Sequence, residues 1–153
     1  TPFQWASMLR REEYLERAYL VKDTLKEQLN KKSIKYQYHD AEVTILEGVL
    51  ARGDRKISKV IEEAYRLGAL YDSWSDIWLQ AFENTGIDYE FYTLRKRELD
   101  EILPWDFIDI GVSKAFLKRE WEAACDSRVS PNCRQACLAC GAKRFNSGVC
   151  CGH

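Results

Sequence analysis

The sequence has no long apolar run and almost no excess of charge of either sign. No segment approaches the ~20 uninterrupted apolar residues that are needed to cross a bilayer. The 23 Lys and Arg residues nearly balance the 24 Asp and Glu residues, which leaves a formal net charge of −1. The first absence excludes a membrane span, and the second argues against binding nucleic acid through overall positive charge. We therefore expect no membrane partner.

Methionine and histidine are also scarce, with one Met and two His in the chain. The sequence begins at Thr1, without an initiator Met and without the charged leader and apolar core of a signal peptide. We therefore expect a fragment of a longer, cytoplasmic polypeptide. In that compartment cysteines are more often metal ligands or catalytic thiols than structural disulfides.

The chain is nevertheless rich in large apolar side chains, with 46% hydrophobic residues and five Trp, eight Tyr and six Phe in 153 residues. Apolar residues recur every three or four positions in several segments, which predicts amphipathic helices. The first of these spans residues 11–29, and the last runs from Ser113 to about Cys125, where Cys125 is expected to be a small buried side chain. The residues placed to cap helices are Asp40, Asp54, Ser75, Asp88 and Ser113.

A different period appears at residues 34–39, where Ile34, Tyr36 and Tyr38 alternate with polar residues. A period of two predicts a short strand. Because a single strand cannot satisfy its own backbone, its partner must lie elsewhere. The predicted fold class is therefore mainly α, made of amphipathic helices with one or two short strands.

The composition changes after residue 126. Residues 127–153 contain five of the six Cys and four basic residues but no Asp or Glu. Bulky apolar residues are few in this segment, so hydrophobic burial alone cannot order it. We therefore predict two regions, a helical region at 1–126 and a Cys-rich, metal-binding tail at 127–153, which we call the tail.

The five cysteines of the tail are Cys133, Cys137 and Cys140, spaced C-x3-C-x2-C, followed by the adjacent pair Cys150 and Cys151. Four thiolates in so short a span can surround one ion or one cluster, with a net charge of about −2 that the nearby basic residues would offset. The mixed spacing favours an iron–sulfur cluster, whereas zinc more often takes C-x2-C pairs. Zinc therefore remains an alternative, and a tail of disulfides or free thiols is a third.

The adjacent position of Cys150 and Cys151 means that only one of them is needed as a ligand. The C-x3-C-x2-C spacing also matches the motif that cleaves S-adenosylmethionine, but only 13 residues follow Cys140. These are too few to build a barrel after the motif. A cluster bound here is therefore expected to be auxiliary or structural.

Three further segments are distinctive: residues 1–5 (TPFQW), 46–55 (LEGVLARGDR) and 103–114 (LPWDFIDIGVSK). In this order, and followed by a Cys-rich tail, they closely resemble the C-terminal part of a family of radical S-adenosylmethionine proteins with an N-terminal cobalamin-binding-like domain. The resemblance covers nearly the whole chain. It implies that the parent protein contains a radical SAM α/β barrel, on which residues 1–126 form a helical accessory part.

The resemblance also implies cofactors and partners. The parent would use S-adenosylmethionine, a [4Fe–4S] cluster and, through the N-terminal domain, cobalamin. The partner of this chain would be that remainder of the protein, and Gln4 and Trp5 would line the cofactor or substrate end of the barrel. Because the resemblance places the barrel's own three-Cys motif upstream of this chain, no catalytic residue is assigned and the fragment is not expected to be active alone.

A second hypothesis comes from a different class of protein. The basic residues of the tail, with no acidic residue among them, would suit a non-catalytic, zinc-ribbon-like module that binds nucleic acid or a protein partner. The sequence disfavours nucleic acid, because Phe145 is the only aromatic residue of the tail that could stack on a base.

Overall fold

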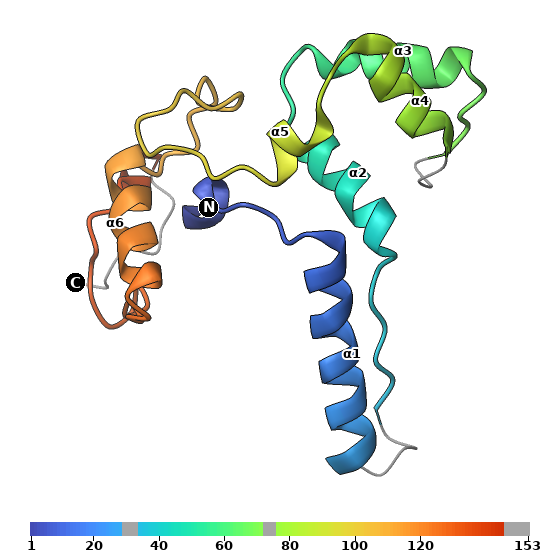
Figure 1. Cartoon of the computed structure of the whole chain (residues 1–153). Helices are drawn as coiled ribbons and strands as arrows, with labels where there is room; N and C mark the ends of the chain where they lie inside the picture. The colour runs from blue at the N-terminus through green and yellow to red at the C-terminus, as the bar shows by residue number, and fades with distance from the viewer. Residues whose placement is uncertain (29–33, 72–75, 146–153) are drawn as a thin grey trace. The chain divides into compact units, whose positions relative to one another are not determined.

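The computed structural model describes residues 1–28, 34–71 and 76–145 (Figure 1). Within these residues the elements are two short 3-10 helices, η1 (Pro2–Trp5) and η2 (Ala142–Phe145), and the helices α1 (Arg11–Gln28), α2 (Ala41–Arg52), α3 (Ile57–Arg66), α4 (Asp76–Thr85), α5 (Tyr89–Thr93) and α6 (Lys114–Cys125). The described residues contain no β-strand, so the mainly α prediction is confirmed. None of the described helices is long and apolar enough to span a membrane.

The chain divides into two compact units. Ser7–Arg95 form one, which we call the central unit, and Thr1–Ala6 with Lys96–His153 form the other, which we call the terminal unit. The terminal unit thus joins the two ends of the sequence. The composition predicts a different boundary, between a helical region at 1–126 and the metal-binding tail at 127–153. That boundary stays a prediction.

Three of the predicted caps are confirmed, because the polar side chain before each helix accepts a hydrogen bond from a backbone N–H in the first turn. Asp40 accepts at 2.9 Å from Glu42 N, Asp88 at 2.8 Å from Glu90 N, and Ser113 at 3.2 Å from Phe116 N. These bonds satisfy donors that the helix itself leaves unpaired.

The other two caps differ. Asp54 lies before the turn that precedes α3 and accepts at 2.8 Å from Lys56 N and at 3.1 Å from the Tyr92 hydroxyl, while the N-cap position belongs to Lys56. Asp54 therefore fixes the turn and ties it to α5. The predicted cap Ser75 lies outside the described residues.

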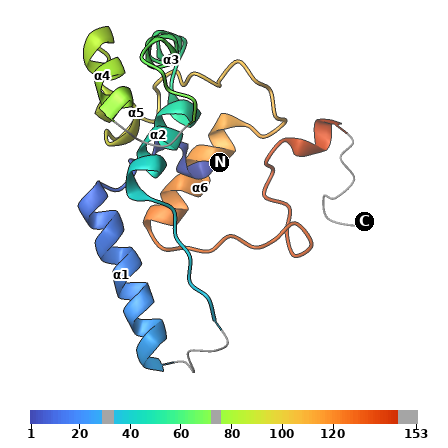
Figure 2. The ribbon, with the colours of Figure 1, turned by 90° about the vertical axis from the view of Figure 1, so that its right-hand side faces the viewer.

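The hydrophobic core belongs to the central unit. Its fully or nearly fully buried members come from α2 to α5 and are Leu46, Val49, Ile57, Val60, Ala64, Trp78, Ala81, Phe82 and Tyr92. The most extensive contact between two helices is between α3 and α4, which lie side by side (Figures 1 and 2). In α2 and α3 the buried positions lie three or four residues apart, as they do on one face of an amphipathic helix.

The strand predicted at 34–39 is wrong, because residues 34–40 form an irregular extended segment without a strand partner among the described residues. This segment runs beside α1 in both views of the ribbon (Figures 1 and 2). Its alternating tyrosines contact that helix and each other: the rings of Tyr38 and Tyr19 meet edge to face, with centroids 6.3 Å apart. Side-chain contact with α1 thus takes the place of a sheet.

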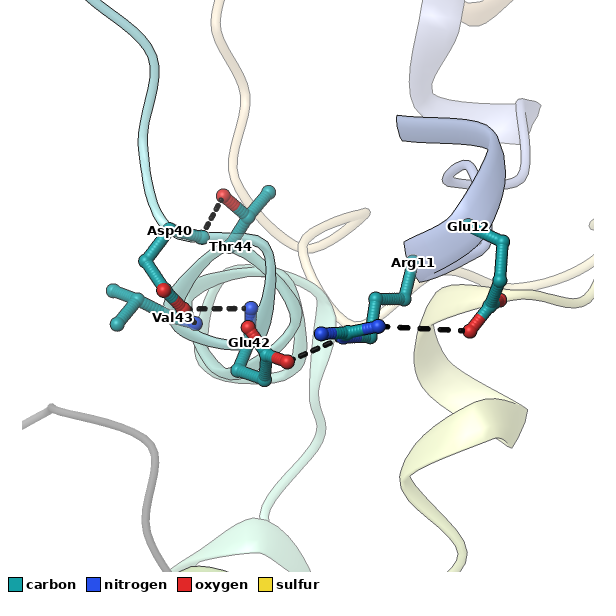
Figure 3. Close-up of polar contacts among 6 residues, drawn as sticks. All are labelled: Arg11, Glu12, Asp40, Glu42, Val43 and Thr44. Carbon is teal, nitrogen blue, oxygen red and sulfur yellow. Dashed lines mark hydrogen bonds and ion pairs between the residues drawn. The ribbon is translucent and has the colours of Figure 1, made fainter. Parts of the chain in front are cut away.

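The helix α1 is present, but its apolar stripe is largely uncovered. Among Arg11–Glu27, the part of the helix whose side chains the structure describes, only Ala18 is buried, and Leu20 is 67% exposed. The first turn of α1 is joined to α2 by an ion pair between Arg11 and Glu42 (Figure 3). The Tyr14 hydroxyl donates at 2.9 Å to His39 O, just before α2. Polar contacts at one end therefore fix this helix within the central unit.

The terminal unit has a much smaller interior. Trp5 and Leu103 are fully buried there, together with the charged Arg97, whose backbone N–H donates at 3.2 Å to Trp5 O. The guanidinium of Arg97 lies 5.8 Å from the ring centroid of Trp105. Residues 103–108 form two overlapping turns, with Asp106 N donating to Leu103 O and Ile108 N donating to Trp105 O, both at 3.0 Å.

Candidate metal-binding tail and the adjoining cleft

The tail begins at a sharp reversal at the end of α6. The helix ends at Cys125, and Ser127 takes a left-handed backbone conformation with φ of 55°. The N–H groups of Ser127 and Arg128 return to the carbonyl groups of Ala124 and Ala123, at 3.0 and 2.8 Å. This arrangement ends the helix and turns the chain back on itself.

Four polar contacts then hold the tail along α6 and the loop before it. Ser130 Oγ donates at 2.6 Å to Glu120, and Arg119 donates to the carbonyl of Leu138. Farther along, Ser113 N donates at 2.8 Å to Cys140 O, and Arg144 forms an ion pair with Asp109. The contacted residues of the tail run upward from Ser130 to Arg144, while their partners run downward from Glu120 to Asp109. The tail therefore runs antiparallel to α6, back toward the segment that precedes the helix (Figure 2).

Between the first two of these contacts the backbone makes a local turn. Asn132 Oδ1 accepts at 2.9 Å from Arg134 N, and Asn132 O accepts at 2.9 Å from Gln135 N. This is the Asx-type turn that asparagine favours. It places Cys133 and Cys137 on one solvent-exposed stretch, since residues 131–137 are all exposed.

The stretch from Cys137 to Gly141 has an unusual backbone. Ala139 adopts φ of 53°, which is uncommon for a residue with a Cβ, and Gly141 adopts φ of 101°. Cys140 lies between them, and its side chain is partly exposed. The backbone therefore changes direction on both sides of this cysteine, which presents its thiol at a corner of the loop.

The donor chemistry of this loop fits a thiolate-bound metal centre. Three soft sulfur ligands lie within eight residues, and the thiols of Cys133 and Cys137 are exposed and accessible to an ion. In the described residues no three His, Cys, Asp or Glu side chains lie together closely enough to hold an ion. Cys150 and Cys151, the remaining predicted ligands, lie outside the described residues.

The basic residues of the tail are less unpaired than the sequence suggested. Arg144 forms an ion pair with Asp109, and Arg128 lies 3.0 Å from Asp126, so two acidic residues from outside the tail compensate two of its four positive charges. Arg134 and Lys143 form no ion pair with a described residue. This leaves two cations near the cysteines to offset thiolate charge.

Cys125 is exposed, so the expectation of a small buried side chain is wrong. It is the last residue of α6, and no residue of that helix is fully buried. The apolar side of α6 is covered only in part, with Trp121 meeting Phe3 edge to face at 6.0 Å between ring centroids. The helical period of this segment predicts a helix with one inward side. It does not predict how deeply that side is buried, because the depth depends on the small interior of the terminal unit.

A cleft of about 440 Å³ lies beside the tail within the terminal unit. The polar residues that line it include Gln4, Asp106, Asp109, Lys114 and Arg144. Gln4 therefore lies at a cavity, as a ligand-binding residue would, while its neighbour Trp5 is fully buried. The role of both residues in cofactor binding stays a prediction.

Two ion pairs lie in the cleft, Lys114 with Asp106 and Arg144 with Asp109. Lys114 Nζ donates at 2.6 Å to Asp106 Oδ2 and at 2.9 Å to Glu101 O. Burial works to raise the pKa of Asp106, but hydrogen bonds from Lys114 and Leu103 N and the charge of Lys114 outweigh it, and the pKa lies below its ordinary value. Asp106 is therefore ionised at neutral pH.

Sequence reasoning assigned no role to Arg119, Glu120, Asp106, Asp109 or Lys114. The Asp-x-Gly pattern at 109–111 is a local turn signal, and Asp109 does accept at 2.9 Å from Gly111 N. The partner that gives Asp109 its position in the site, Arg144, is 35 residues away. No local pattern signals such a contact.

Comparison of the chain with protein-family models, with curated proteins and with solved structures found no match.

Proposed function

We propose that this chain is the C-terminal accessory region of a radical S-adenosylmethionine enzyme and that its tail binds an auxiliary iron–sulfur cluster. The proposal rests on the resemblance of the segments at 1–5, 46–55 and 103–114 and on the spacing of Cys133, Cys137 and Cys140. Such a cluster would supply one-electron transfer or a structural crosslink between segments of the chain.

One structural observation supports a metal in the tail above all others. Residues 131–137 are exposed throughout, and Val129 is 95% exposed, yet polar contacts hold both ends of this stretch against α6. A segment that buries so little apolar surface needs another source of order. Bonds from its cysteines to a metal centre would provide it, as in small metal-dependent domains.

A second observation supports an accessory role. The loop before α6 exposes four large apolar side chains within nine residues, of which Ile102 is 85% and Phe107 is 86% exposed; the other two are Ile108 and Ile110. Several large exposed apolar side chains in one loop suit a protein interface. In the proposed function this loop packs on the remainder of the enzyme.

Iron binding is tested by anaerobic reconstitution of the full chain with ferrous iron and sulfide. We expect a broad visible absorbance and stoichiometric iron and sulfide, both lost in the variant with Cys133→Ala, Cys137→Ala and Cys140→Ala. Cys125→Ala is the matched control, because this thiol is exposed but lies on α6 outside the tail. Iron bound equally by the triple variant, or tight binding of zinc with no uptake of iron, would overturn the cluster.

The accessory role is tested separately by iron analysis of the full-length polypeptide that contains this chain. We expect more iron than one [4Fe–4S] cluster accounts for, and a drop to the content of one cluster in the triple Cys variant. The fragment alone is expected to cleave no S-adenosylmethionine. A full-length protein with no iron at all would exclude a radical S-adenosylmethionine enzyme.

A further inference from the structure

The cleft of the terminal unit has the size and the lining of a small-molecule site. Its volume of about 440 Å³ lies in the usual range of roughly 300–1,000 Å³ for ligand pockets. One part of the lining is apolar and consists of Ile108, Ile110, Val112 and Leu117. The remainder carries the two ion pairs described above. The cleft can therefore receive a ligand that has an apolar part and a polar part.

Its polar groups have hydrogen-bonding capacity left over. The side-chain oxygen of Gln4 accepts at 2.7 Å from Trp105 Nε1, which fixes the amide and leaves its NH₂ group without an acceptor among the described residues. Lys114 uses two of its three N–H groups, on Asp106 and on Glu101 O. The cleft thus has donors that remain available to a carboxylate.

Acceptors are available as well. All hydrogen bonds of the Asp106 carboxylate with described residues go to Oδ2, and all those of Asp109 go to Oδ1. The second oxygen of each side chain is therefore an available acceptor. These oxygens could bind an ammonium group, which has three donors and no acceptor.

The charged side chains of the lining are balanced in sign. Asp106, Asp109, Lys114 and Arg144 sum to zero, so these side chains favour a ligand that itself carries one positive and one negative group. We propose that the cleft binds a zwitterionic α-amino acid with an apolar side chain. Its carboxylate binds Lys114 and the Gln4 amide, its ammonium group binds Asp109 Oδ2, and its side chain lies on the apolar part.

This proposal is independent of the metal centre, and its test uses the full chain without iron. Binding of L-leucine and L-phenylalanine is measured by calorimetry and by ligand-observed NMR. The matched probes are phenethylamine, which lacks the carboxylate, 3-phenylpropionate, which lacks the ammonium group, and glycine, which lacks the side chain. We expect saturable binding of at least one of the two amino acids and at least about ten-fold weaker binding of all three probes, because each loses a charged hydrogen bond or the apolar contact.

Variants locate the site. Asp109→Asn and Gln4→Leu are expected to weaken binding of the amino acid by about ten-fold, while far-UV circular dichroism shows that they are folded. Asp126→Asn is the control, because Asp126 pairs with Arg128 at the end of α6, outside the cleft. The proposal is overturned if neither amino acid binds, if the matched probes bind as well as the amino acid, or if folded Asp109→Asn and Gln4→Leu proteins bind it unchanged.

Discussion

Asp40 shows how one side chain fixes both a helix and a pH response. It caps α2 through bonds from Glu42 N and Val43 N, as Figure 3 shows. Hydrogen bonds with Val43 and Glu42 hold the pKa of Asp40 below its ordinary value of 3.8. The folded state therefore favours the ionised carboxylate, and the resulting stability is present above that value and lost as the pH falls through the lower pKa of the folded protein.

We predict that Asp40→Ala lowers the free energy of unfolding by about 1 kcal/mol at pH 7, the usual cost of losing an N-cap. Asp40→Asn retains a capping oxygen but no charge, so at pH 7 it should lower the free energy of unfolding by less than Asp40→Ala does. Its effect on the free energy of unfolding should be smaller still when the pH is brought below 3.8. Urea unfolding at pH 7 and pH 3 measures both quantities. Equal losses for the two variants at both pH values would contradict the capping role.

Gly141 is the second residue whose identity the structure explains. Its φ of 101° is a left-handed value, and a Cβ at this position would lie 2.8 Å from Gly111 O, a backbone atom that cannot move without the whole loop. Two costs therefore act on any larger residue here, backbone strain and a steric clash. The clash falls at the point where the tail meets the loop before α6.

We predict that Gly141→Ala releases the tail from that loop and destabilises the protein by about 1 to 3 kcal/mol. The control is Gly68→Ala, whose φ of 97° is nearly the same but whose Cβ would meet nothing within 4 Å, so it carries the strain alone. Hydrogen exchange at Ser113 N, which donates to Cys140 O, should rise sharply in Gly141→Ala and remain unchanged in Gly68→Ala. Unchanged exchange in both proteins would show that the contact does not depend on this glycine.

At the level of elements, the contact between α6 and the tail depends on side chains rather than on a hydrophobic seam. Arg119 donates to the backbone carbonyl of Leu138, which lies between the second and third cysteines of the motif. We predict that Arg119→Ala frees this part of the tail, so that proteolysis and amide exchange at residues 131–141 increase several-fold while α6 itself stays folded.

Lys118→Ala is the matched control for this prediction, since Lys118 is the neighbouring cation of α6 and makes no hydrogen bond or ion pair with a described residue. Its effect on the tail should be small. If both variants loosen the tail equally, then the positive charge of α6, and not the contact with Leu138, holds the tail in place.

The elements also show what the sequence could and could not predict. Helix periods and capping residues are local signals, and the caps at Asp40, Asp88 and Ser113 were predicted correctly. The segment at 34–39 was not, because alternation of tyrosines fits contact with a neighbouring helix as well as a strand. The cleft was beyond prediction, since it joins Gln4 to Trp105 across 101 residues.

Across the whole molecule the two units are stabilised in different ways. Among its described residues, the central unit has a continuous core of nine buried side chains from four helices. In the terminal unit the tail is fixed by hydrogen bonds and ion pairs, and the loop before α6 leaves Phe107 and Ile102 exposed. The terminal unit is therefore the part that an added ligand, metal or protein surface would stabilise most, because the central unit already has a hydrophobic core built from α2 to α5.

From this difference we predict that metal loading protects only one unit. A centre bound by Cys133, Cys137 and Cys140 would hold the exposed stretch of the tail, with about 2.7 kcal/mol of stabilisation when the free metal is at 100 times its dissociation constant. Hydrogen exchange of the reconstituted full chain should slow in residues 113–145 and stay unchanged in α2 to α5. Removal of the metal by a chelator should reverse the effect, and the triple Cys variant should show none. Equal protection of both units, or protection that survives in the triple variant, would mean that the metal acts elsewhere than on the tail.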